Sequence, residues 1–391
     1  MIIFVFCFQI QIIMNYYKRA VLDDFYIKLK PNKVLVLLGA RRVGKTQIIN
    51  KYLESCKETV LQLNGEDIND ARLLEERSVL NYSKLLKNST LLVIDEAQNI
   101  PNIGLILKLI VDTIDGIKVI ATGSSMFDLA NKLGEPLVGR KNTLYLFPLA
   151  QIEFSQFENY KQITEKLEER LIFGGYPELT QYDSWNEKTV YLKEIINSYL
   201  LKDILIFDGI KNADKIYDLL RLIAFQVGSE VSMQELGNQL NLSKNTVSSY
   251  LDLLSKVFIL FKIEGFSKNL RKEITKSSRW YFYDNGIRNT IINNFNEIKN
   301  RTDVGALWEN YLASERIKKQ HYQKKYKQNY FWRTYDQQEL DWLETQAETI
   351  AGFEFKWNEN RKTKIPTAFA KAYPEATFEV INKQNYLDFI M

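Results

Sequence analysis

Residues 39–46 read GARRVGKT and match the phosphate-binding pattern G-x-x-x-x-G-K-[ST] at every required position. The two glycines let the backbone curl, so that its N–H groups and the following helix N-terminus surround phosphates. Lys45 is expected to reach the β and γ phosphates of ATP, and Thr46 to offer its hydroxyl to Mg²⁺. The expected nucleotide contacts from this loop are Gly39, Ala40, Arg41, Arg42, Val43, Gly44, Lys45, Thr46 and Gln47.

A pair of adjacent acids supplies the second half of such a site. Asp95 and Glu96 follow the apolar residues of STLLVIDEAQ, residues 89–98. Asp95 is expected to hold Mg²⁺, while Glu96 would orient and deprotonate the attacking water. An acidic pair on the surface is a poor alternative, because four apolar residues precede it. The second carboxylate favours hydrolysis of ATP over transfer of phosphate to a small molecule, so an ATPase is predicted.

Polar residues after a third apolar run are candidates for sensing the γ phosphate. The segment IKVIATG, residues 117–123, contains Thr122 and is followed by Ser124 and Ser125. At the carboxyl edge of a parallel sheet these hydroxyls would lie near the phosphate, although helix N-capping explains the serines equally well. Arg140, in the sequence VGR, is a candidate arginine finger, and a homo-oligomer follows if it acts in trans. A lone arginine before a strand is more often structural, so that alternative stays open.

The sequence GFEFKW, residues 352–357, places Glu354 and Lys356 on one face of an expected strand. With Asp341 on an earlier strand and Glu309 on a helix, they resemble the core of PD-(D/E)xK nucleases, although the proline of the PD dipeptide is missing. In that chemistry Glu309, Asp341 and Glu354 hold Mg²⁺ or Mn²⁺, and Lys356 positions the attacking water. The alternative is an ion pair within the strand, or a nuclease-like fold kept only to bind DNA or a protein.

Helical segments between these two groups predict a winged helix. Residues 215–228, 232–240 and 243–257 have helical spacing of apolar residues, and Ser232 and Ser243 are expected N-caps. The strand FILFKIEGF and the basic segment that follows it would form the wing. The third helix would offer DNA contacts through its first residues, although such modules often serve only for packing. The expected contacts are Lys244, Asn245, Thr246 and Ser249.

Composition limits the chemistry and the partners. Two cysteines and one histidine exclude a zinc site or a disulfide framework, so catalysis must use carboxylates, lysine, arginine and bound metal. The net charge is +4, with basic residues gathered in segments 268–279 and 315–327. A nucleic-acid partner and a solvated helix face explain these segments equally well. The apolar residues 1–14 fit neither a secretory signal nor a membrane span, so a start assigned too early, no membrane partner and a cytoplasmic location are expected.

The motifs GARRVGKT, VIDEAQ, ATGSS, VGR and FGGYPEL, taken together, resemble AAA+-related P-loop ATPases of bacteria and archaea. The resemblance implies an α/β fold in which the phosphate-loop strand is central in a parallel sheet of the P-loop NTPase type. It also implies that Gly175, Tyr176 and Pro177 approach the nucleotide base, although a tight turn between helices is an open alternative for this stretch. A winged helix and a restriction-endonuclease-like α/β domain are implied to follow. A chain of 391 residues needs two or three domains. The predicted divisions are an apolar extension 1–14, an ATPase domain 15–205, a winged helix 206–290 and a nuclease-like domain 291–391.

These features together predict an ATP-binding and ATP-hydrolysing switch that acts on nucleic acid. Its C-terminal domain would bind DNA and, with Mg²⁺, would cut it when the ATPase state permits. The alternative is a signalling NTPase whose C-terminal half is a catalytically inactive module that binds a protein or DNA. Binding that weakens with salt favours nucleic acid, because phosphate contacts release counterions.

Overall fold

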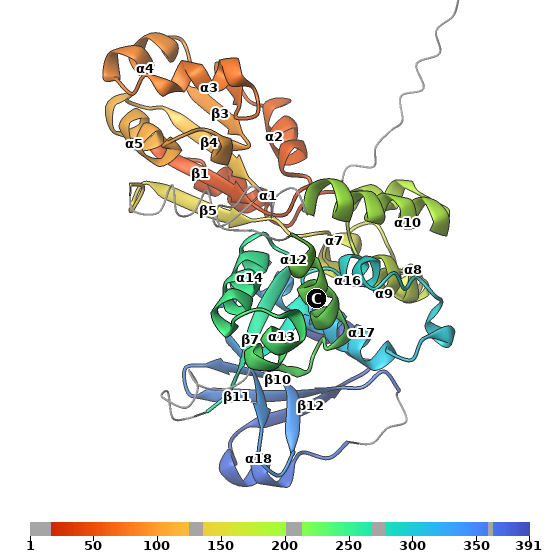
Figure 1. Cartoon of the computed structure of the whole chain (residues 1–391). Helices are drawn as coiled ribbons and strands as arrows, with labels where there is room; N and C mark the ends of the chain where they lie inside the picture. Colours follow the sequence, from red (N-terminus) through yellow and green to blue (C-terminus); the bar gives the residue numbers. More distant parts are fainter. Residues whose placement is uncertain (1–16, 125–135, 201–212, 268–277, 359–362) are drawn as a thin grey trace, which may run out of the picture.

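The computed structural model describes residues 17–124, 136–200, 213–267, 278–358 and 363–391. These residues form two β-sheets, one on the N-terminal side of the chain and one on the C-terminal side (Figure 1). The extension 1–14, Ser125 and the greater part of the basic segment 268–279 lie outside the described residues. None of the described helices combines the length and the apolar character that a membrane crossing requires.

The N-terminal sheet confirms the predicted parallel α/β fold. Its five described strands run in parallel in the order β2–β3–β4–β1–β5. They are β1 (Lys33–Leu38), β2 (Val60–Asn64), β3 (Leu91–Asp95), β4 (Lys118–Gly123) and β5 (Lys141–Tyr145). Strands β1, β3 and β4 are almost wholly buried, which explains their continuous apolar sequences. The phosphate-loop strand β1 is an interior strand between β4 and β5, although β4 is the middle one.

Short helices connect these strands. They are α1 (Leu22–Lys28), α2 (Lys45–Leu53), α3 (Ile68–Glu75), α4 (Val79–Leu85), η1 (Ala97–Asn99) and α5 (Ile103–Thr113). Helix α2 begins directly after Gly44, whose φ of 95° lies in the left-handed region that favours glycine. The phosphate loop therefore turns from the carboxyl end of β1 straight into a helix N-terminus.

A helical segment leads from β5 to the second half of the chain. Its elements are α7 (Gln151–Phe154), α8 (Tyr160–Glu165), α9 (Leu167–Phe173), η2 (Pro177–Gln181), α10 (Trp185–Glu194) and the π-helical η3 (Ile195–Leu200). Ser184 caps α10, because its hydroxyl accepts a hydrogen bond from the N–H of Glu187 at 3.2 Å. The long helix expected over residues 187–206 is thus α10 followed by a π-helical turn, and its end lies outside the described residues.

Three helices come next and pack together. They are α12 (Ala213–Phe225), α13 (Met233–Leu240) and α14 (Lys244–Lys256). Ser232 and Ser243 cap α13 and α14 as predicted, each accepting a backbone N–H of the first turn. The antiparallel strands of this part are β6 (Glu230–Val231), which lies between α12 and α13 in the chain, and β7 (Leu260–Gly265) and β8 (Ser278–Phe282), which follow α14. Strand β8 lies between β6 and β7, and its five residues are all buried.

The C-terminal sheet contains these strands as well as four later ones. Its described strands run in the order β12–β11–β10–β9–β7–β8–β6. The later strands are β9 (Gln328–Arg333), β10 (Glu339–Gln346), β11 (Thr349–Phe355) and β12 (Thr377–Ile381). The helices of this part are α16 (Asn285–Ile291), η4 (Ile298–Asn300), α17 (Val304–Tyr322), α18 (Thr367–Ala372) and α19 (Tyr386–Ile390). Because β7 pairs with β9, one sheet runs across residue 290, where the sequence predicts a domain boundary.

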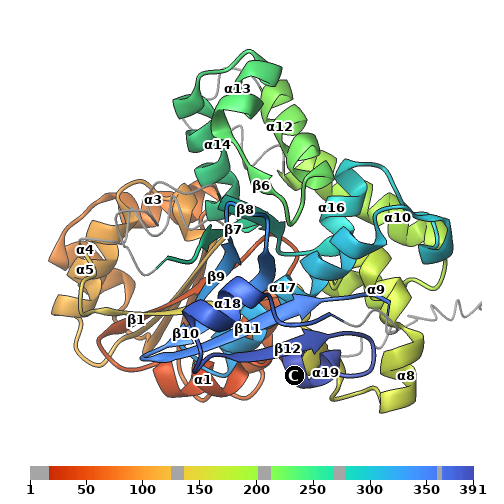
Figure 2. The same cartoon turned by 90° about the horizontal axis from the view of Figure 1, so that it is seen from below.

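Helix α17 connects this sheet to the rest of the molecule. It contacts β8 and β11 on one side and α9 and α16 on the other (Figure 2). Phe353 and Phe355 share a face of β11, as predicted, and both rings pack on Phe389 of α19. Glu354 lies on the opposite face of β11, where Asp341 of the neighbouring strand β10 and Lys356 influence its charge.

Candidate functional site

The phosphate loop is held in a fixed shape by its neighbours. A side chain at Gly39 would place its Cβ 2.1 Å from the carbonyl oxygen of Leu146, so this position requires glycine. The Nζ atom of Lys45 donates to the carbonyl oxygens of Gly39 and Ala40 at 2.8 and 3.0 Å. The ammonium group is thereby positioned at the mouth of the loop, where the β and γ phosphates of a nucleotide would lie.

Two threonine hydroxyls hold Asp95 at the carboxyl end of β3. Thr46 Oγ1 donates to Asp95 Oδ2 at 3.0 Å, and Thr122 Oγ1 donates to Asp95 Oδ1. Thr122 also accepts the backbone N–H of Glu96 at 2.9 Å, which joins the ends of β3 and β4. The carboxylate of Asp95 and the hydroxyl of Thr46 form an oxygen donor set of the kind that suits Mg²⁺. These two residues therefore fit the metal role that the sequence predicts.

A neighbouring side chain that the sequence analysis did not predict holds the carboxylate of Glu96. Gln98 Nε2 donates to Glu96 Oε2 at 2.5 Å and to Ser124 Oγ at 3.3 Å. Glu96 itself has a φ of 49°, a strained conformation for a residue with a side chain, and such residues concentrate at functional sites. Gln98 is the last residue of the sequence VIDEAQ and lies two positions after Glu96. This spacing was the signal from which the contact could have been predicted.

A cavity of about 490 Å³ lies against the loop. One wall consists of the loop, the start of α2 and Glu96, and the other of residues from η2. The lining residues are Arg41, Arg42, Gly44, Lys45, Thr46, Gln47, Glu96, Pro177, Glu178 and Gln181. Pro177 of the predicted turn thus faces the phosphate loop, and Arg42 approaches Glu178 across the cavity at 3.8 Å. Ala40 and Val43 also belong to the loop, but both are buried and neither lines the cavity.

Arg140 lies away from this cavity. It immediately precedes β5, which runs parallel to β1, so it lies at the amino edge of the sheet, opposite the phosphate loop. Its Nε atom pairs with Asp112 Oδ1 of α5 at 2.5 Å. Arg140 is thus placed away from the nucleotide site of its own chain. An arginine finger that acts in trans, on another copy of the chain, stays a prediction.

The predicted metal ligands of the C-terminal half gather around an arginine. We call Arg279, Glu309, Asp341, Glu354 and Lys356 the carboxylate cluster. Arg279 Nη1 of β8 lies 3.5 Å from Glu309 Oε1 and 3.7 Å from Asp341 Oδ1. Asp341 Oδ2 accepts the backbone N–H of Phe355 at 2.8 Å, and Lys356 Nζ pairs with Glu354 Oε1 at 2.5 Å.

Burial raises the pKa of each acid in this cluster. The pKa of Glu309 is raised to about 8, first by burial and then by the negative charge of Asp341. Burial also raises the pKa of Asp341 and that of Glu354, where the charge of Asp341 adds to the effect. Tyr281 donates a hydrogen bond to Glu309 Oε1 at 2.7 Å, and Glu354 Oε2 is buried without a hydrogen-bond partner in the described part of the chain.

This geometry gives the three predicted metal ligands other partners, and metal binding by Glu309, Asp341 and Glu354 stays a prediction. Within the described ranges, no three histidine, cysteine or acidic side chains are placed to hold a metal ion. The guanidinium of Arg279 stands between two of the three carboxylates and supplies the positive charge that a cation would bring. Lys356 is engaged by Glu354, which is the ion pair within the strand that the sequence left open. The sequence placed Arg279 in an exposed basic wing, whereas β8 buries it.

Two buried side chains connect the nucleotide cavity to the C-terminal half. Arg19 Nη1 donates to the carbonyl oxygen of Val43 in the phosphate loop, and its Nη2 donates to Phe147 O and lies 3.5 Å from Tyr322 Oη on α17. Its Nε pairs with Glu153 Oε1 at 2.8 Å. The sequence offered no signal for Arg19, because its partners come from four distant segments.

Asp284 makes the second connection. This buried residue caps α16 through the N–H of Ile287 at 3.2 Å. Its other carboxylate oxygen accepts the N–H of Gly175 at 2.8 Å, just before the turn that lines the cavity. Gly174 must be glycine here, because a Cβ atom would lie 2.1 Å from Asp284 Oδ1 and because its φ is 76°.

Comparisons with known proteins agree with the nucleotide site. A family model described as an AAA domain matches residues 31–155, and two models described as domains of unknown function, DUF8612 and DUF4143, match residues 164–298 and 304–387. An uncharacterized protein of Methanocaldococcus jannaschii is 31% identical over 267 residues, which are 62% of this chain and 59% of that protein. An uncharacterized protein of Haemophilus influenzae is 25% identical over 66% of this chain and 69% of its own length. The matched part of the chain thus spans about three fifths of the first of these relatives.

Two solved structures match this chain over part of its length. A Walker-type ATPase of Pyrococcus abyssi has a TM-score of 0.49 at 15% identity, covering 71% of this chain and 96% of that one. A signal transduction ATPase with numerous domains from Pyrococcus horikoshii, which carries a tetratricopeptide repeat sensor, has a TM-score of 0.31 at 13% identity, covering 78% and 46%. Residues 31–155 thus match an AAA domain model, and they contain a loop with the geometry of a P-loop nucleotide site.

Proposed function

We propose that the chain binds and hydrolyses ATP in the 490 Å³ cavity and acts as a nucleotide switch. The observation that carries this proposal is that Lys45, Thr46 and Glu96 share one wall of this cavity. Lys45 neutralises the β and γ phosphates, and the loop N–H groups bind their oxygens. Thr46 and Asp95 would hold Mg²⁺, which would neutralise charge on the same phosphates.

Glu96 is the proposed general base for the attacking water. A carboxylate that removes a proton must be held in one orientation, since a small displacement weakens proton transfer. Gln98 supplies that restraint by donating to one of the two carboxylate oxygens, and Ser124 fixes Gln98 in turn. The second oxygen of Glu96 is left for the water.

The nucleotide state reaches the C-terminal half along two proposed routes. A shift of the loop at Val43 would move Arg19, which also contacts Tyr322 of α17. A shift of η2 on the far wall of the cavity would act on Asp284 through Gly175 and thereby on α16. Both routes consist of buried, hydrogen-bonded groups, which have few alternative arrangements and so transmit displacement.

The C-terminal half is proposed to bind nucleic acid without cutting it. The chain order α12–β6–α13–α14–β7–β8 is consistent with a winged helix, and Lys244, Asn245 and Ser249 are exposed in the first turns of α14. The arginine within the carboxylate cluster argues against metal-dependent cleavage, because it neutralises the acids that a metal would need. A nuclease-like fold retained as a binding module is therefore favoured over an active nuclease.

Phosphate release from ATP by the purified full-length chain, with Mg²⁺, tests the central claim. Wild type is expected to turn over ATP, and Lys45→Ala to lose both nucleotide binding and turnover because the phosphates lose their buried counter-charge. Lys51→Ala is a matched control, since Lys51 is an exposed lysine of the same helix that pairs with Glu54. Undiminished turnover by Lys45→Ala would overturn the assignment of the cavity.

A further inference from the structure

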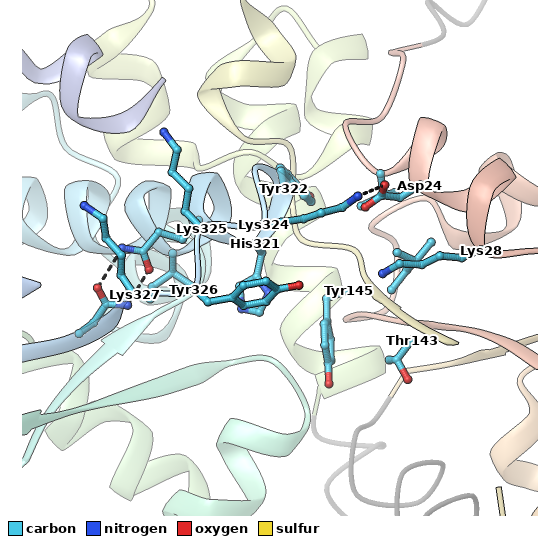
Figure 3. Close-up of a pocket in the computed structure, with 15 residues that line it drawn as sticks. Asp24, Lys28, Thr143, Tyr145, His321, Tyr322, Lys324, Lys325, Tyr326 and Lys327 are labelled. Atoms are coloured by element: carbon cyan, nitrogen blue, oxygen red, sulfur yellow. Dashed lines mark hydrogen bonds and ion pairs between the residues drawn. The ribbon is translucent and has the colours of Figure 1, made fainter. Parts of the chain in front are cut away.

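A second cavity, of about 290 Å³, lies between the ATPase domain and the C-terminal sheet (Figure 3). Helix α1 and strand β5 form one side of it, and the end of α17 with the start of β9 forms the other. We call this cavity the basic groove and define it by six lining residues. They are Lys28, Tyr145, Lys324, Lys325, Tyr326 and Lys327.

Positive charge exceeds negative charge in the basic groove. Asp24 is the one acid among its lining residues, and it pairs with Lys324. Lys327 pairs with Glu344 at 2.7 Å, whereas Lys28 and Lys325 form no ion pair with any described residue. The two ends of the groove in Figure 3 therefore each carry an ammonium group available to an anionic ligand.

Aromatic rings lie between these ammonium groups. Tyr326 is 85% exposed. A tyrosine ring that is exposed to this degree gains little stability from packing within the chain. Tyr145 of β5 is half-buried, and its ring packs against that of His321 with centroids 5.5 Å apart. Figure 3 shows Tyr326 and Tyr145 in the middle of the groove, with lysines on both sides. Such an alternation provides planar surfaces for bases and cations for the backbone that links them.

We propose that the basic groove binds single-stranded nucleic acid, with phosphates at Lys28 and Lys325 and a base stacked on Tyr326. A duplex would satisfy the lysines, but its bases are already stacked and cannot lie on a tyrosine ring. An acidic peptide would also satisfy the lysines, but it has no large planar groups for the rings. DNA and RNA strands share the phosphates and the bases that this site recognises.

The position of the basic groove gives this site a second property. Tyr322 lies in its floor and accepts the backbone N–H of Phe147 at 3.3 Å. The same hydroxyl lies 3.5 Å from Arg19, which donates to the phosphate loop at Val43. Because the groove spans both halves of the chain, a nucleotide that shifts the loop changes its geometry, and coupling between sites is reciprocal. This coupling rests on the proposed switch function, whereas strand binding by itself does not.

The test is fluorescence anisotropy of labelled oligo(dT) and oligo(U) with the full-length chain, first without nucleotide and then with ATP. A duplex of equal length and a polyglutamate competitor are measured alongside. The double variant Lys325→Glu/Tyr326→Ala is compared with Tyr160→Ala/Lys161→Glu. The control pair is an adjacent tyrosine and lysine on α8, where Tyr160 is 69% exposed. Thermal unfolding shows that each variant is folded.

We expect the groove substitutions to weaken the binding of both single strands and to leave duplex binding unchanged. The groove variant should bind at least tenfold more weakly, while the control variant should match wild type. The single variant Lys325→Ala should reduce the slope of log affinity against log salt by about one, because one phosphate contact is lost. Tyr326→Ala should weaken binding about tenfold without changing that slope, because it removes stacking alone.

The proposal is overturned if the groove variant binds single strands as well as wild type, or if it loses as much affinity for the duplex as for the strands. Equal competition by polyglutamate would also overturn it, since charge alone would then explain binding. A chain that hydrolyses ATP but binds no oligonucleotide refutes the groove and leaves the ATPase standing. A chain that binds oligonucleotides through the groove but releases no phosphate from ATP refutes the proposed function instead.

Discussion

The nucleotide cavity and the carboxylate cluster both combine acidic and basic side chains, but the two regions surround these groups differently. In the cavity, neutral hydroxyls hold Asp95, and Lys45 is held by two carbonyl oxygens. In the cluster, charged partners hold the acids: Arg279 lies beside Glu309 and Asp341, and Lys356 pairs with Glu354. The first arrangement leaves net charge available to a ligand, and the second neutralises it internally.

The difference shows why chemically suitable residues do not by themselves make a site. A hydroxyl satisfies the hydrogen-bonding capacity of a carboxylate without cancelling its charge, so a cation still gains by binding there. A buried guanidinium cancels that charge, and a metal would have to displace it into a region that offers no water. The same acidic residues therefore suit a ligand site in one sheet and an internal ion-pair network in the other.

The largest expected effect is a difference in ATP turnover between two matched glutamate-to-glutamine substitutions, one in each region. Glu96→Gln should lower ATP turnover at least a hundredfold, because a general base contributes about 10² to 10⁴ in rate. It should retain ATP binding, since the loop and Lys45 are unchanged. Glu354→Gln should leave turnover at the wild-type level. Phosphate release and calorimetric titration with ATP measure both properties, and equal losses in the two variants would contradict the separation of the sites.

A second experiment removes the arginine that distinguishes the cluster. Arg279→Ala should lower the free energy of unfolding by about 3–5 kcal/mol, because it leaves buried acids without a counter-charge. Mn²⁺ should then raise the unfolding midpoint of the variant more than that of wild type, since a divalent cation can take the place of the guanidinium. Urea denaturation with and without Mn²⁺ measures both effects.

Arg279→Lys is the control for this experiment, because it retains the charge while losing the planar fork that contacts two acids. It should be destabilised less than Arg279→Ala. Wild type stabilised by Mn²⁺ as strongly as Arg279→Ala would show that the cluster already binds metal, and the contrast between the two regions would fail.

The raised acid pKa values of the cluster predict a pH dependence of stability. The pKa of Glu309 is raised from 4.5 to about 8, so the folded state keeps a proton that the unfolded chain releases in that window. Stability should therefore fall as pH rises from about 4.5 to about 8 and then level off. The raised pKa values of Asp341 and Glu354 act in the same direction. Glu309→Gln should show a smaller fall in urea denaturation across this range, and an unchanged fall would mean that Glu309 is not its source.

The elements of the ATPase domain were predictable because their signals are local. An apolar strand, a glycine-containing loop and a helix follow one another within residues 33–53, so the sequence itself contains the geometry. The caps at Ser232 and Ser243 were predictable for the same reason. The continuous C-terminal sheet was not, because β7 and β9 are paired across more than sixty residues of intervening chain.

The unpredicted parts of the sites depend on distant partners. Arg279 looked like a member of an exposed basic segment, and only its burial on β8, between β6 and β7, brings it to Glu309. Arg19 contacts the phosphate loop, Phe147 after β5, α7 and α17, none of which is near it in sequence. The sequence around a charged residue does not show whether the tertiary structure will bury it. Networks of buried ion pairs are therefore visible only in the structure.

The smallest expected effect concerns the residue that orients the base. Gln98→Ala should lower ATP turnover about tenfold and leave the KM for ATP unchanged, because Glu96 keeps its carboxylate but loses the donor that fixes it. Gln181→Ala, on the η2 wall of the same cavity, should instead raise KM with little change in turnover. Steady-state kinetics of the two variants distinguish these patterns. A rise in KM without a fall in turnover for Gln98→Ala would show that this residue binds the nucleotide and does not orient the base. The nucleotide cavity would then lack the neutral orienting contact that distinguishes it from the carboxylate cluster.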